Sequence, residues 1–277
     1  MNILAQNVAP HNQMTIQLEV ITRLPQFAST KPPLLFIHGA FTGAWCWNEH
    51  FLPYFAQHGY PSYAVSLRGH GKSQGSELLL QASLDDYVAD VARVVEKIGQ
   101  PVVLIGHSMG GMVAQKYMES KQLRAVVLMN SVPPTGLSAS SLYLSFTAPF
   151  LMQQLSVIQT AGPEYTALSA VKKALFSEDM PDAEVQRFFN QMQGESQRVM
   201  MDMLGLNLPM LADYHDFPIL VLGAENDAFF PTLAIESTAK IYQADKYIFP
   251  NIAHAMMLEK RWQTVADKMF DWLQQIA

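Results

Sequence analysis

The chain has 277 residues, of which 49% are hydrophobic and 15% are charged, so it is long enough to bury a sizeable core. Its formal net charge of −6, without a basic run or a mixed aromatic and basic patch, argues against nucleic acid as a partner. The single cysteine, Cys46, excludes an internal disulfide, and no group of cysteines and histidines has the spacing of zinc ligands. We therefore expect no metal site.

The sequence carries no sign of export or membrane insertion. Residues 1–10 have neither the basic start nor the long apolar segment of a secretory signal peptide. No run approaches the roughly 18 apolar residues that a membrane-spanning helix needs. The sequence therefore predicts a cytoplasmic protein without a membrane span, either a monomer or a homodimer.

The first elements alternate between strands and helices. Residues 14–22 alternate apolar and polar side chains, which predicts an antiparallel strand with one solvated face. Residues 34–37 are apolar throughout, as in a strand covered on both faces, and run into a loop of small residues, 38–45. A helix is predicted over residues 46–58 and a short strand over residues 63–66.

The next helix and strand lead to a distinctive turn. Ser83 and Asp86 form a capping-box pattern at the start of a helix predicted over residues 84–98, which Gly99 ends. The apolar, β-branched residues 102–105 then predict a strand, and residues 106–110 read Gly-His-Ser-Met-Gly before a helical pattern begins. A further buried strand is predicted over residues 125–129.

The alternation stops over residues 133–214, a span rich in Leu, Phe and Met and interrupted by prolines. This pattern predicts a helical cap, residues 133–214, inserted into a core made of residues 1–132 and 215–277. Its methionines favour packing between helices over a ligand site, although some could line an apolar cavity; they are Met152, Met192, Met200, Met201, Met203 and Met210. Strands at 218–223 and 246–249 and a helix at 260–276 complete a mostly parallel sheet covered on both faces.

Ser108 lies in the Gly-x-Ser-x-Gly turn between a predicted strand and a predicted helix. The glycines allow close backbone packing on both sides, and the turn would lift the hydroxyl to a helix N-terminus, where negative charge is favoured. This context favours a nucleophile. The alternative is an ordinary turn with a serine that caps the helix.

A serine nucleophile needs a histidine base, and the base needs a carboxylate to fix its tautomer. His254 follows the last predicted strand, and Asp227 follows the strand before it, so both belong at the carboxyl edge of the sheet. The chain order of Ser108, Asp227 and His254 fits this arrangement. Asp227 is favoured over Glu225 because it lies deeper in its loop. The remaining nearby histidines are interpreted as hydrogen-bonded loop supports: His38, His70 and His107.

The oxyanion of the reaction needs two hydrogen-bond donors, for which we predict the backbone N–H groups of Ala40 and Met109. Neighbouring apolar side chains are predicted to contact the substrate: Phe41, Trp45, Phe229 and Met256. An apolar acyl group or an aromatic ester is favoured as substrate by the flanking side chains Phe41, Phe229, Phe230, Met256 and Met257. No metal and no organic cofactor is required.

Over essentially its whole length, the sequence resembles the α/β-hydrolase superfamily. The matching segments are His38-Gly39 with Gly43-Ala44-Trp45, Arg68-Gly69-His70-Gly71-Lys72-Ser73, Gly106-His107-Ser108-Met109-Gly110-Gly111, Asp227, and His254 with Glu259. The first loop is similar to that of small esterases and hydroxynitrile lyases, and the Ser108 turn to that of monoacylglycerol lipases and carboxylesterases. The resemblance implies an α/β-hydrolase fold with a helical cap after the sixth strand. Ala253 and Lys260 depart from the common pattern and put any narrow subfamily in doubt.

The combined features predict a serine hydrolase that cleaves a small or medium apolar carboxylic ester. In haloalkane dehalogenases and epoxide hydrolases an aspartate stands where this chain has Ser108, which sets those reactions aside. The same three residues would also serve carbon–carbon bond hydrolysis, thioester hydrolysis or perhydrolysis, because the cap selects the reaction. A ligand-binding, receptor-like protein with little turnover is a further alternative.

Overall fold

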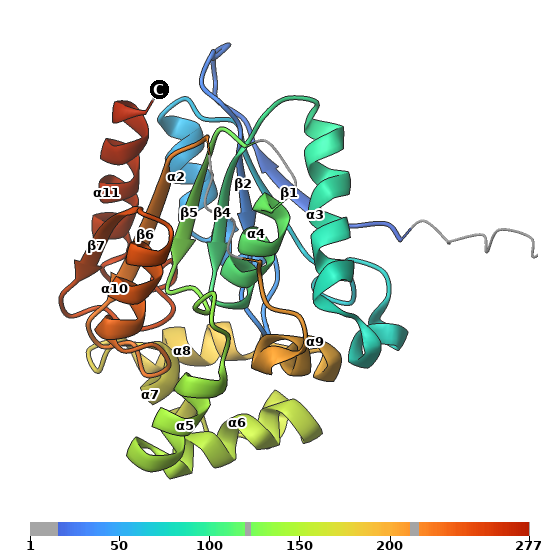
Figure 1. Cartoon of the computed structure of the whole chain (residues 1–277), viewed down its shortest axis with the longest axis vertical. Helices are drawn as coiled ribbons and strands as arrows, with labels where there is room; N and C mark the ends of the chain where they lie inside the picture. The colour runs from blue at the N-terminus through green and yellow to red at the C-terminus, as the bar shows by residue number, and fades with distance from the viewer. Residues whose placement is uncertain (1–15, 120–122, 211–215, 277) are drawn as a thin grey trace, which may run out of the picture.

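A computed structural model describes residues 16–119, 123–210 and 216–276, and its described strands form one seven-stranded sheet (Figure 1). The strand order is β1-β3-β2-β4-β5-β6-β7. β1 pairs antiparallel with β3, and every other neighbouring pair is parallel, which confirms the predicted mostly parallel sheet. The strands are β1 (Val20–Arg23), β2 (Leu34–Ile37), β3 (Ser62–Val65), β4 (Val103–His107), β5 (Ala125–Met129), β6 (Ile219–Ala224) and β7 (Asp245–Phe249).

The central strands are buried on both faces because helices cover the sheet from both sides. Successive side chains of a strand point to opposite faces, so Leu34 and Phe36 join one apolar cluster and Leu35 and Ile37 join the other. The first cluster contains side chains of α1 (Trp45–Asn48), α2 (Phe51–Gln57) and α11 (Trp262–Gln275). The second contains side chains of α3 (Leu84–Ile98), α4 (Met109–Met118) and α10 (Thr232–Ile241).

The local signals locate α3 to the residue. Ser83 accepts a hydrogen bond from the Asp86 N–H, the Asp86 side chain accepts one from the Ser83 N–H, and Gly99 ends the helix with φ 72°. The helix predicted over residues 46–58 is instead two helices, α1 and α2, with a break before Phe51. Pro53 explains the break, because proline is tolerated only in the first turn of a helix and would clash with the carbonyl four residues earlier.

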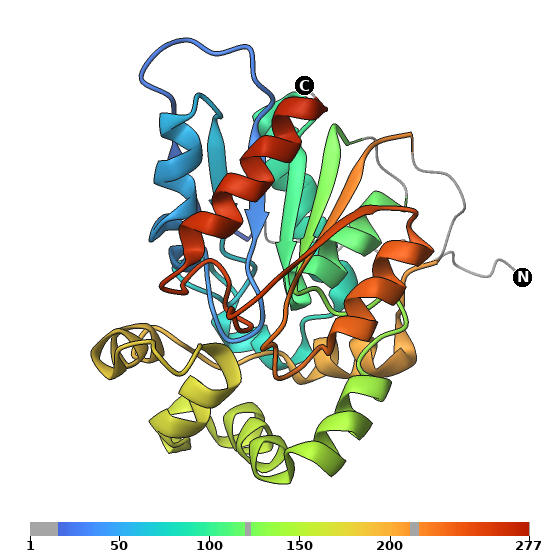
Figure 2. The same ribbon diagram turned by 90° about the vertical axis from the view of Figure 1, so that its left-hand side faces the viewer.

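Between β5 and β6 the chain forms a set of helices, called here the inserted helices, which lie beyond one end of the sheet (Figures 1 and 2). They are α5 (Ser138–Thr147), α6 (Pro149–Ala161), η2 (Pro163–Tyr165), α7 (Leu168–Leu175), α8 (Asp182–Phe189), α9 (Gln197–Met201) and η3 (Asp202–Leu206). The resemblance implied a cap after the sixth strand, whereas among the described residues these helices follow the fifth strand, β5. The described chain has one antiparallel strand, β1, ahead of β2, and residues 1–15 lie outside the description.

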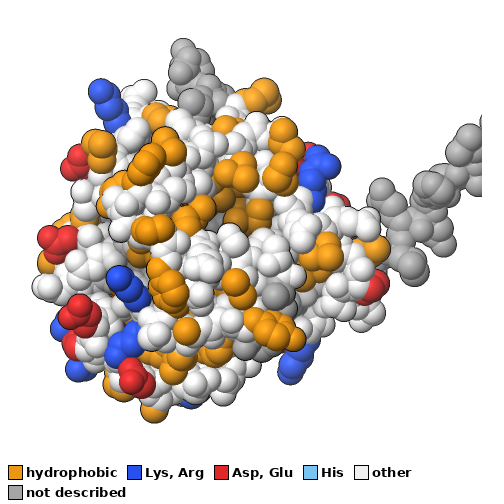
Figure 3. All heavy atoms as spheres, turned by 90° about the horizontal axis from the view of Figure 1, so that it is seen from below, with side chains coloured by type: hydrophobic (Ala, Val, Ile, Leu, Met, Phe, Trp, Pro, Cys, Tyr) orange, Lys and Arg blue, Asp and Glu red, His pale blue; other side chains and the backbone are white. Residues whose placement is uncertain are grey.

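The face formed by the inserted helices exposes many hydrophobic side chains (Figure 3). Residues 125–163 contain no Asp, Glu, Lys or Arg, and α5 and α6 expose Leu142, Tyr143, Phe146 and Phe150. Among the described residues, no helix is both long enough and apolar enough to cross a membrane. The expectation that the chain has no signal peptide concerns residues 1–10, which lie outside the described ranges.

Candidate active site

Ser108 lies in a strained turn between β4 and α4. Its backbone has φ 52° and ψ −118°, a left-handed conformation that costs a non-glycine residue roughly 1–3 kcal/mol. A Cβ on Gly106 would collide with the Gly110 carbonyl group, and one on Gly110 would come 2.5 Å from the His38 carbonyl oxygen. The Ser108 side chain makes no capping hydrogen bond to α4, so the alternative of a helix-capping serine receives no support.

Asp227 and His254 meet beyond the carboxyl ends of β6 and β7. His254 Nδ1 donates to Asp227 Oδ2 across 2.8 Å, and both side chains are buried. The other oxygen, Asp227 Oδ1, accepts the backbone N–H groups of Phe229 at 2.7 Å and Phe230 at 3.1 Å. Glu225, the rival acid, is exposed to solvent. With Nδ1 engaged, the Nε2 atom of His254 is the ring nitrogen available to the Ser108 hydroxyl.

Asn130 and Glu259 hold the loop that carries His254. Asn130 Nδ2 donates to the His254 carbonyl at 3.0 Å, and Asn130 Oδ1 accepts the N–H of Ala224 at 2.9 Å. Glu259 Oε1 accepts the N–H of Ala253 at 3.1 Å. Asn130 therefore fixes the two strand ends that supply Asp227 and His254 relative to each other. Sequence reasoning missed Asn130, whose one local signal is a polar residue directly after a buried strand.

Two of the other histidines support loops as neutral rings. His38 Nδ1 donates to the Gly39 carbonyl at 2.8 Å, and its Nε2 accepts the N–H of Leu67 at 3.0 Å. Burial, assisted by nearby His70, lowers the pKa of His38 to about 3. His107 Nε2 donates to the His254 carbonyl at 2.9 Å, and burial holds the pKa of His107 well below its usual range. Both rings therefore act as predicted, as hydrogen-bonded supports.

Ser108 and His254 line an apolar cavity of about 390 Å³ between the core and the inserted helices. Of the predicted substrate contacts, Phe41, Trp45 and Phe229 line this cavity. Met256 does not. Its side chain is fully buried in the core cluster that holds α11, because consecutive side chains in this turn point in different directions, and its neighbour Met257 lines the cavity instead.

The inserted helices supply much of the cavity wall. These helices and the connection between α8 and α9 contribute four of the methionines singled out in the sequence: Met152, Met192, Met200 and Met203. Met201 and Met210 are exposed instead. The alternative that some of these methionines line an apolar cavity therefore holds for the four.

The two predicted oxyanion donors also border the cavity. Met109 is the first residue of α4, so its N–H has no acceptor within the helix. The N–H of Ala40 belongs to the same peptide as the Gly39 carbonyl, which accepts hydrogen bonds from His38 Nδ1 at 2.8 Å and Thr42 Oγ1 at 2.9 Å. Since the C=O and N–H of a trans peptide point in opposite directions, these bonds orient the Ala40 N–H as well.

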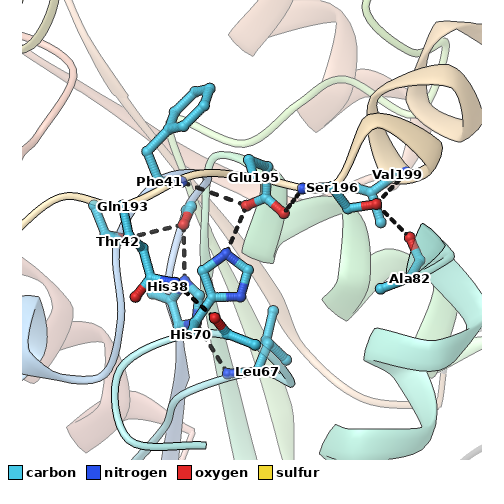
Figure 4. Close-up of polar contacts among 12 residues, drawn as sticks. His38, Phe41, Thr42, Leu67, His70, Ala82, Gln193, Glu195, Ser196 and Val199 are labelled. Atoms are coloured by element: carbon cyan, nitrogen blue, oxygen red, sulfur yellow. Dashed lines mark hydrogen bonds and ion pairs between the residues drawn. The ribbon is translucent and has the colours of Figure 1, made fainter. Parts of the chain in front are cut away.

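His70 and Glu195 form a buried ion pair beside this loop (Figure 4). His70 Nε2 lies 3.0 Å from Glu195 Oε2, and the Tyr87 hydroxyl donates to Glu195 Oε1 at 2.7 Å. Burial opposes both charges, but the attraction of the partners outweighs it, so the pKa of His70 lies above and that of Glu195 below its usual value. Sequence reasoning predicted His70 as a support but missed Glu195.

The ion pair predicts a pH dependence of stability. Because the pKa of His70 is raised, its stabilising charge is fully present below about pH 6.5, the usual pKa of histidine, and is lost as the pH rises through the raised value. The negative charge of Asp90 also raises the pKa of His70, and the neighbouring His38 ring is neutral and therefore adds no positive charge beside it. We expect His70→Gln to lower the free energy of unfolding by about 3 kcal/mol near pH 6, and by less at higher pH. Urea unfolding of both proteins at several pH values measures this; a constant difference up to pH 10 would contradict a charged His70.

Within the described residues, no group of three or more His, Cys, Asp or Glu side chains is placed to hold a metal ion. The polar groups at the cavity wall include Ser108 in its strained turn and His254, whose ring is bound to the Asp227 carboxylate, and the backbone N–H groups of Ala40 and Met109 lie beside them. This set is suited to nucleophilic attack on a carbonyl carbon.

Residues 34–268 match the sequence profile of the family described as "Alpha/beta hydrolase family". The chain belongs to this family. A segment of 106 residues of this chain is 36% identical to a non-heme chloroperoxidase of Streptomyces lividans, and the match covers 37% of each chain. The chain matches the first three curated relatives over only 28–40% of their own lengths.

Solved structures resemble this chain over nearly its whole length. A bromoperoxidase from Bacillus anthracis has a TM-score of 0.76 at 19% identity, with 95% of this chain and 97% of that chain covered. An esterase from Rhodococcus sp. ECU1013 has a TM-score of 0.75 at 20% identity, with 95% and 96% covered. At these identities the likeness establishes the shared fold.

Proposed function

We propose that this hydrolase cleaves a small or medium apolar carboxylic ester through an acyl-enzyme intermediate. The observation that carries the proposal is the meeting of two features at one apolar cavity: Ser108 in its strained turn and the Asp227–His254 pair at 2.8 Å. Such a pair can accept the serine proton during attack.

In the first half-reaction, Ser108 Oγ bonds to the carbonyl carbon of the ester while its proton passes to His254 Nε2. The negative charge that develops on the carbonyl oxygen is stabilised by the N–H groups of Ala40 and Met109. When the carbon–oxygen bond to the alcohol breaks, His254 returns the proton to the leaving oxygen. Asp227 keeps the Nδ1 proton in place and stabilises the charged ring.

In the second half-reaction, a water molecule attacks the acyl carbon and passes a proton to His254. The same two N–H groups stabilise the second oxyanion, and collapse releases the carboxylic acid and restores the Ser108 hydroxyl. No step calls for a group beyond these side chains and backbone donors.

The cavity wall supports an apolar substrate. No Asp, Glu, Lys or Arg of the described chain lines it, so a charged acyl group would lose its hydration without gaining a partner. Its volume of about 390 Å³ lies near the lower end of the range for small-molecule pockets, roughly 300–1,000 Å³. The uncharged residues 125–163 continue this apolar character to the surface of the inserted helices.

A series of p-nitrophenyl esters from acetate to decanoate tests the proposed substrate class. Each methylene buried contributes about 0.8 kcal/mol, so we expect kcat/KM to rise roughly fourfold per carbon until the cavity is filled. A matched control is an acyl chain of equal length that ends in a carboxylate, for which turnover should fall. Equal or faster turnover of the carboxylate-ended ester would contradict an apolar site.

Perhydrolysis is the second candidate, and the names of the relatives favour it. One is called a non-heme chloroperoxidase and a neighbouring structure a bromoperoxidase. In this reaction hydrogen peroxide, rather than water, attacks the acyl carbon. The bond from that carbon to Ser108 Oγ then breaks, and the product is a peracid. Measuring peracid formation from an acyl donor in the presence of peroxide, beside ester hydrolysis, separates the two candidates.

A further inference from the structure

The loop that carries the Ala40 N–H is held by residues far away in the sequence (Figure 4). Phe41 has φ 65°, a left-handed conformation that a phenylalanine rarely adopts without support. Its carbonyl accepts the N–H of Gln193 at 3.0 Å, and its N–H donates to Glu195 Oε2 at 3.4 Å. Both backbone groups of Phe41 are thus bound by one segment that precedes α9.

The same segment is itself anchored to the core. The Gln193 side chain accepts the N–H of Gly71 at 2.8 Å and donates to the carbonyl of Gly69 at 2.7 Å. Ser196 Oγ donates to the Ala82 carbonyl at 2.6 Å. The segment is therefore fixed to the core loops and in turn fixes Phe41 relative to them. Glu195, its residue that binds the Phe41 N–H, is buried.

The chemistry at this position calls for a carboxylate. Glu195 Oε1 accepts the backbone N–H of Ser196 at 2.7 Å, and Oε2 accepts that of Phe41. A backbone N–H can only donate, so both side-chain oxygens must be acceptors. An amide offers one oxygen and one NH₂ group, and its oxygen would remain on the shorter bond, to Ser196. The Phe41 N–H would then face a second donor.

We propose that Glu195 is a positioning residue for the oxyanion hole: from the segment between α8 and α9 it fixes the Ala40–Phe41 peptide and thereby aims the Ala40 N–H at the reacting carbonyl. His70 supplies its counter-charge. The His70 ring also lies tilted beside that of His38, with 4.9 Å between the ring centres, and His38 holds the adjacent Gly39 carbonyl. The proposal rests on the proposed ester hydrolysis.

A group that positions an oxyanion donor acts mainly in the transition state. Binding of the uncharged ester depends little on the Ala40 N–H, whereas the charged intermediate depends on it strongly. Displacement of this N–H should therefore lower kcat and leave KM nearly unchanged. A merely structural role of Glu195 would instead lower the fraction of folded protein and leave kcat per folded molecule unchanged.

The test compares Glu195→Gln with Asp202→Asn on a p-nitrophenyl ester and on an alkyl trifluoromethyl ketone, which forms an oxyanion with Ser108. Asp202 is a matched control, because it is also a buried carboxylate in the part of the chain between β5 and β6, but it binds the Leu84 N–H and Arg198 instead of the loop. We expect Glu195→Gln to lower kcat about 10- to 100-fold, with KM within twofold and ketone inhibition weakened by a similar factor. Asp202→Asn should leave all three values within twofold of the wild type.

A kcat of folded Glu195→Gln within twofold of the wild type would overturn the role of Glu195. If this variant does not fold, the double variant His70→Gln/Glu195→Gln removes both charges together and should show the same loss of kcat; its wild-type kcat would overturn the proposal equally. Wild-type protein whose ester turnover does not depend on Ser108 would overturn the proposed function itself, and this role with it.

Discussion

Replacement of Ser108 by alanine is expected to lower kcat on an apolar ester by a factor of roughly 10⁴ or more, with little change in KM. The strained turn, with φ 52°, places Ser108 at the cavity that His254 also lines, and without its hydroxyl the proposed covalent intermediate cannot form. The apolar cavity remains, so ground-state binding should persist. Steady-state kinetics with a p-nitrophenyl ester measures both parameters.

Ser131→Ala is the matched control for this prediction. Ser131 is also a buried serine, but it donates to the Val132 carbonyl and accepts from Gln115, and it does not line the cavity. We expect this variant to lose stability and to keep its kcat. Turnover by Ser108→Ala at the wild-type rate would rule out Ser108 as the nucleophile.

Replacement of Asp227 by asparagine is expected to lower kcat by a factor of roughly 10⁴. The amide oxygen should stay with the N–H groups of Phe229 and Phe230, which Asp227 Oδ1 now accepts at 2.7 and 3.1 Å. The NH₂ group then faces His254 Nδ1 and forces that nitrogen to accept. The ring proton moves to Nε2, where it blocks transfer from the Ser108 hydroxyl.

Glu225→Gln provides the control for the aspartate. Glu225 precedes Asp227 by two residues in the same loop and is exposed to solvent. Its replacement by glutamine removes one negative charge, as Asp227→Asn does. We expect kcat within about twofold of the wild type for Glu225→Gln. Similar losses in the two variants would mean that the charge of the loop, rather than the His254 tautomer, is what matters.

Local sequence signals were sufficient for the elements that depend on local contacts. The capping box at Ser83 and the glycine at position 99 place both ends of α3, because the groups that cap a helix lie within a few residues of its ends. The glycines around Ser108 predict its turn for the same reason. Pro53 is likewise a local signal for the break before Phe51, because its ring excludes a continuous helix through the preceding turn.

The order of strands and loops brings Asp227 to His254, as predicted, because parallel strands end at a common edge. The contacts of the inserted helices depend instead on long-range packing. Glu195 meets His70 across 125 positions of sequence, and nothing in its own neighbourhood distinguishes it from a solvated glutamate. The sequence also could not show which of the neighbouring residues Met256 and Met257 lines the cavity, since that depends on how the turn packs: Met257 lines it and Met256 is buried in the core.

Mass spectrometry of the protein after reaction with a fluorophosphonate tests the nucleophile most directly. Cleavage after Lys97 and Lys116 releases residues 98–116, a peptide in which Ser108 is the only Ser, Thr, Tyr or Cys. We predict one phosphonyl group per protein molecule, carried by this peptide at Ser108, and none in Asp227→Asn under conditions of limited reaction time. Labelling of a different peptide, or of none while ester turnover continues, would contradict the assignment of Ser108.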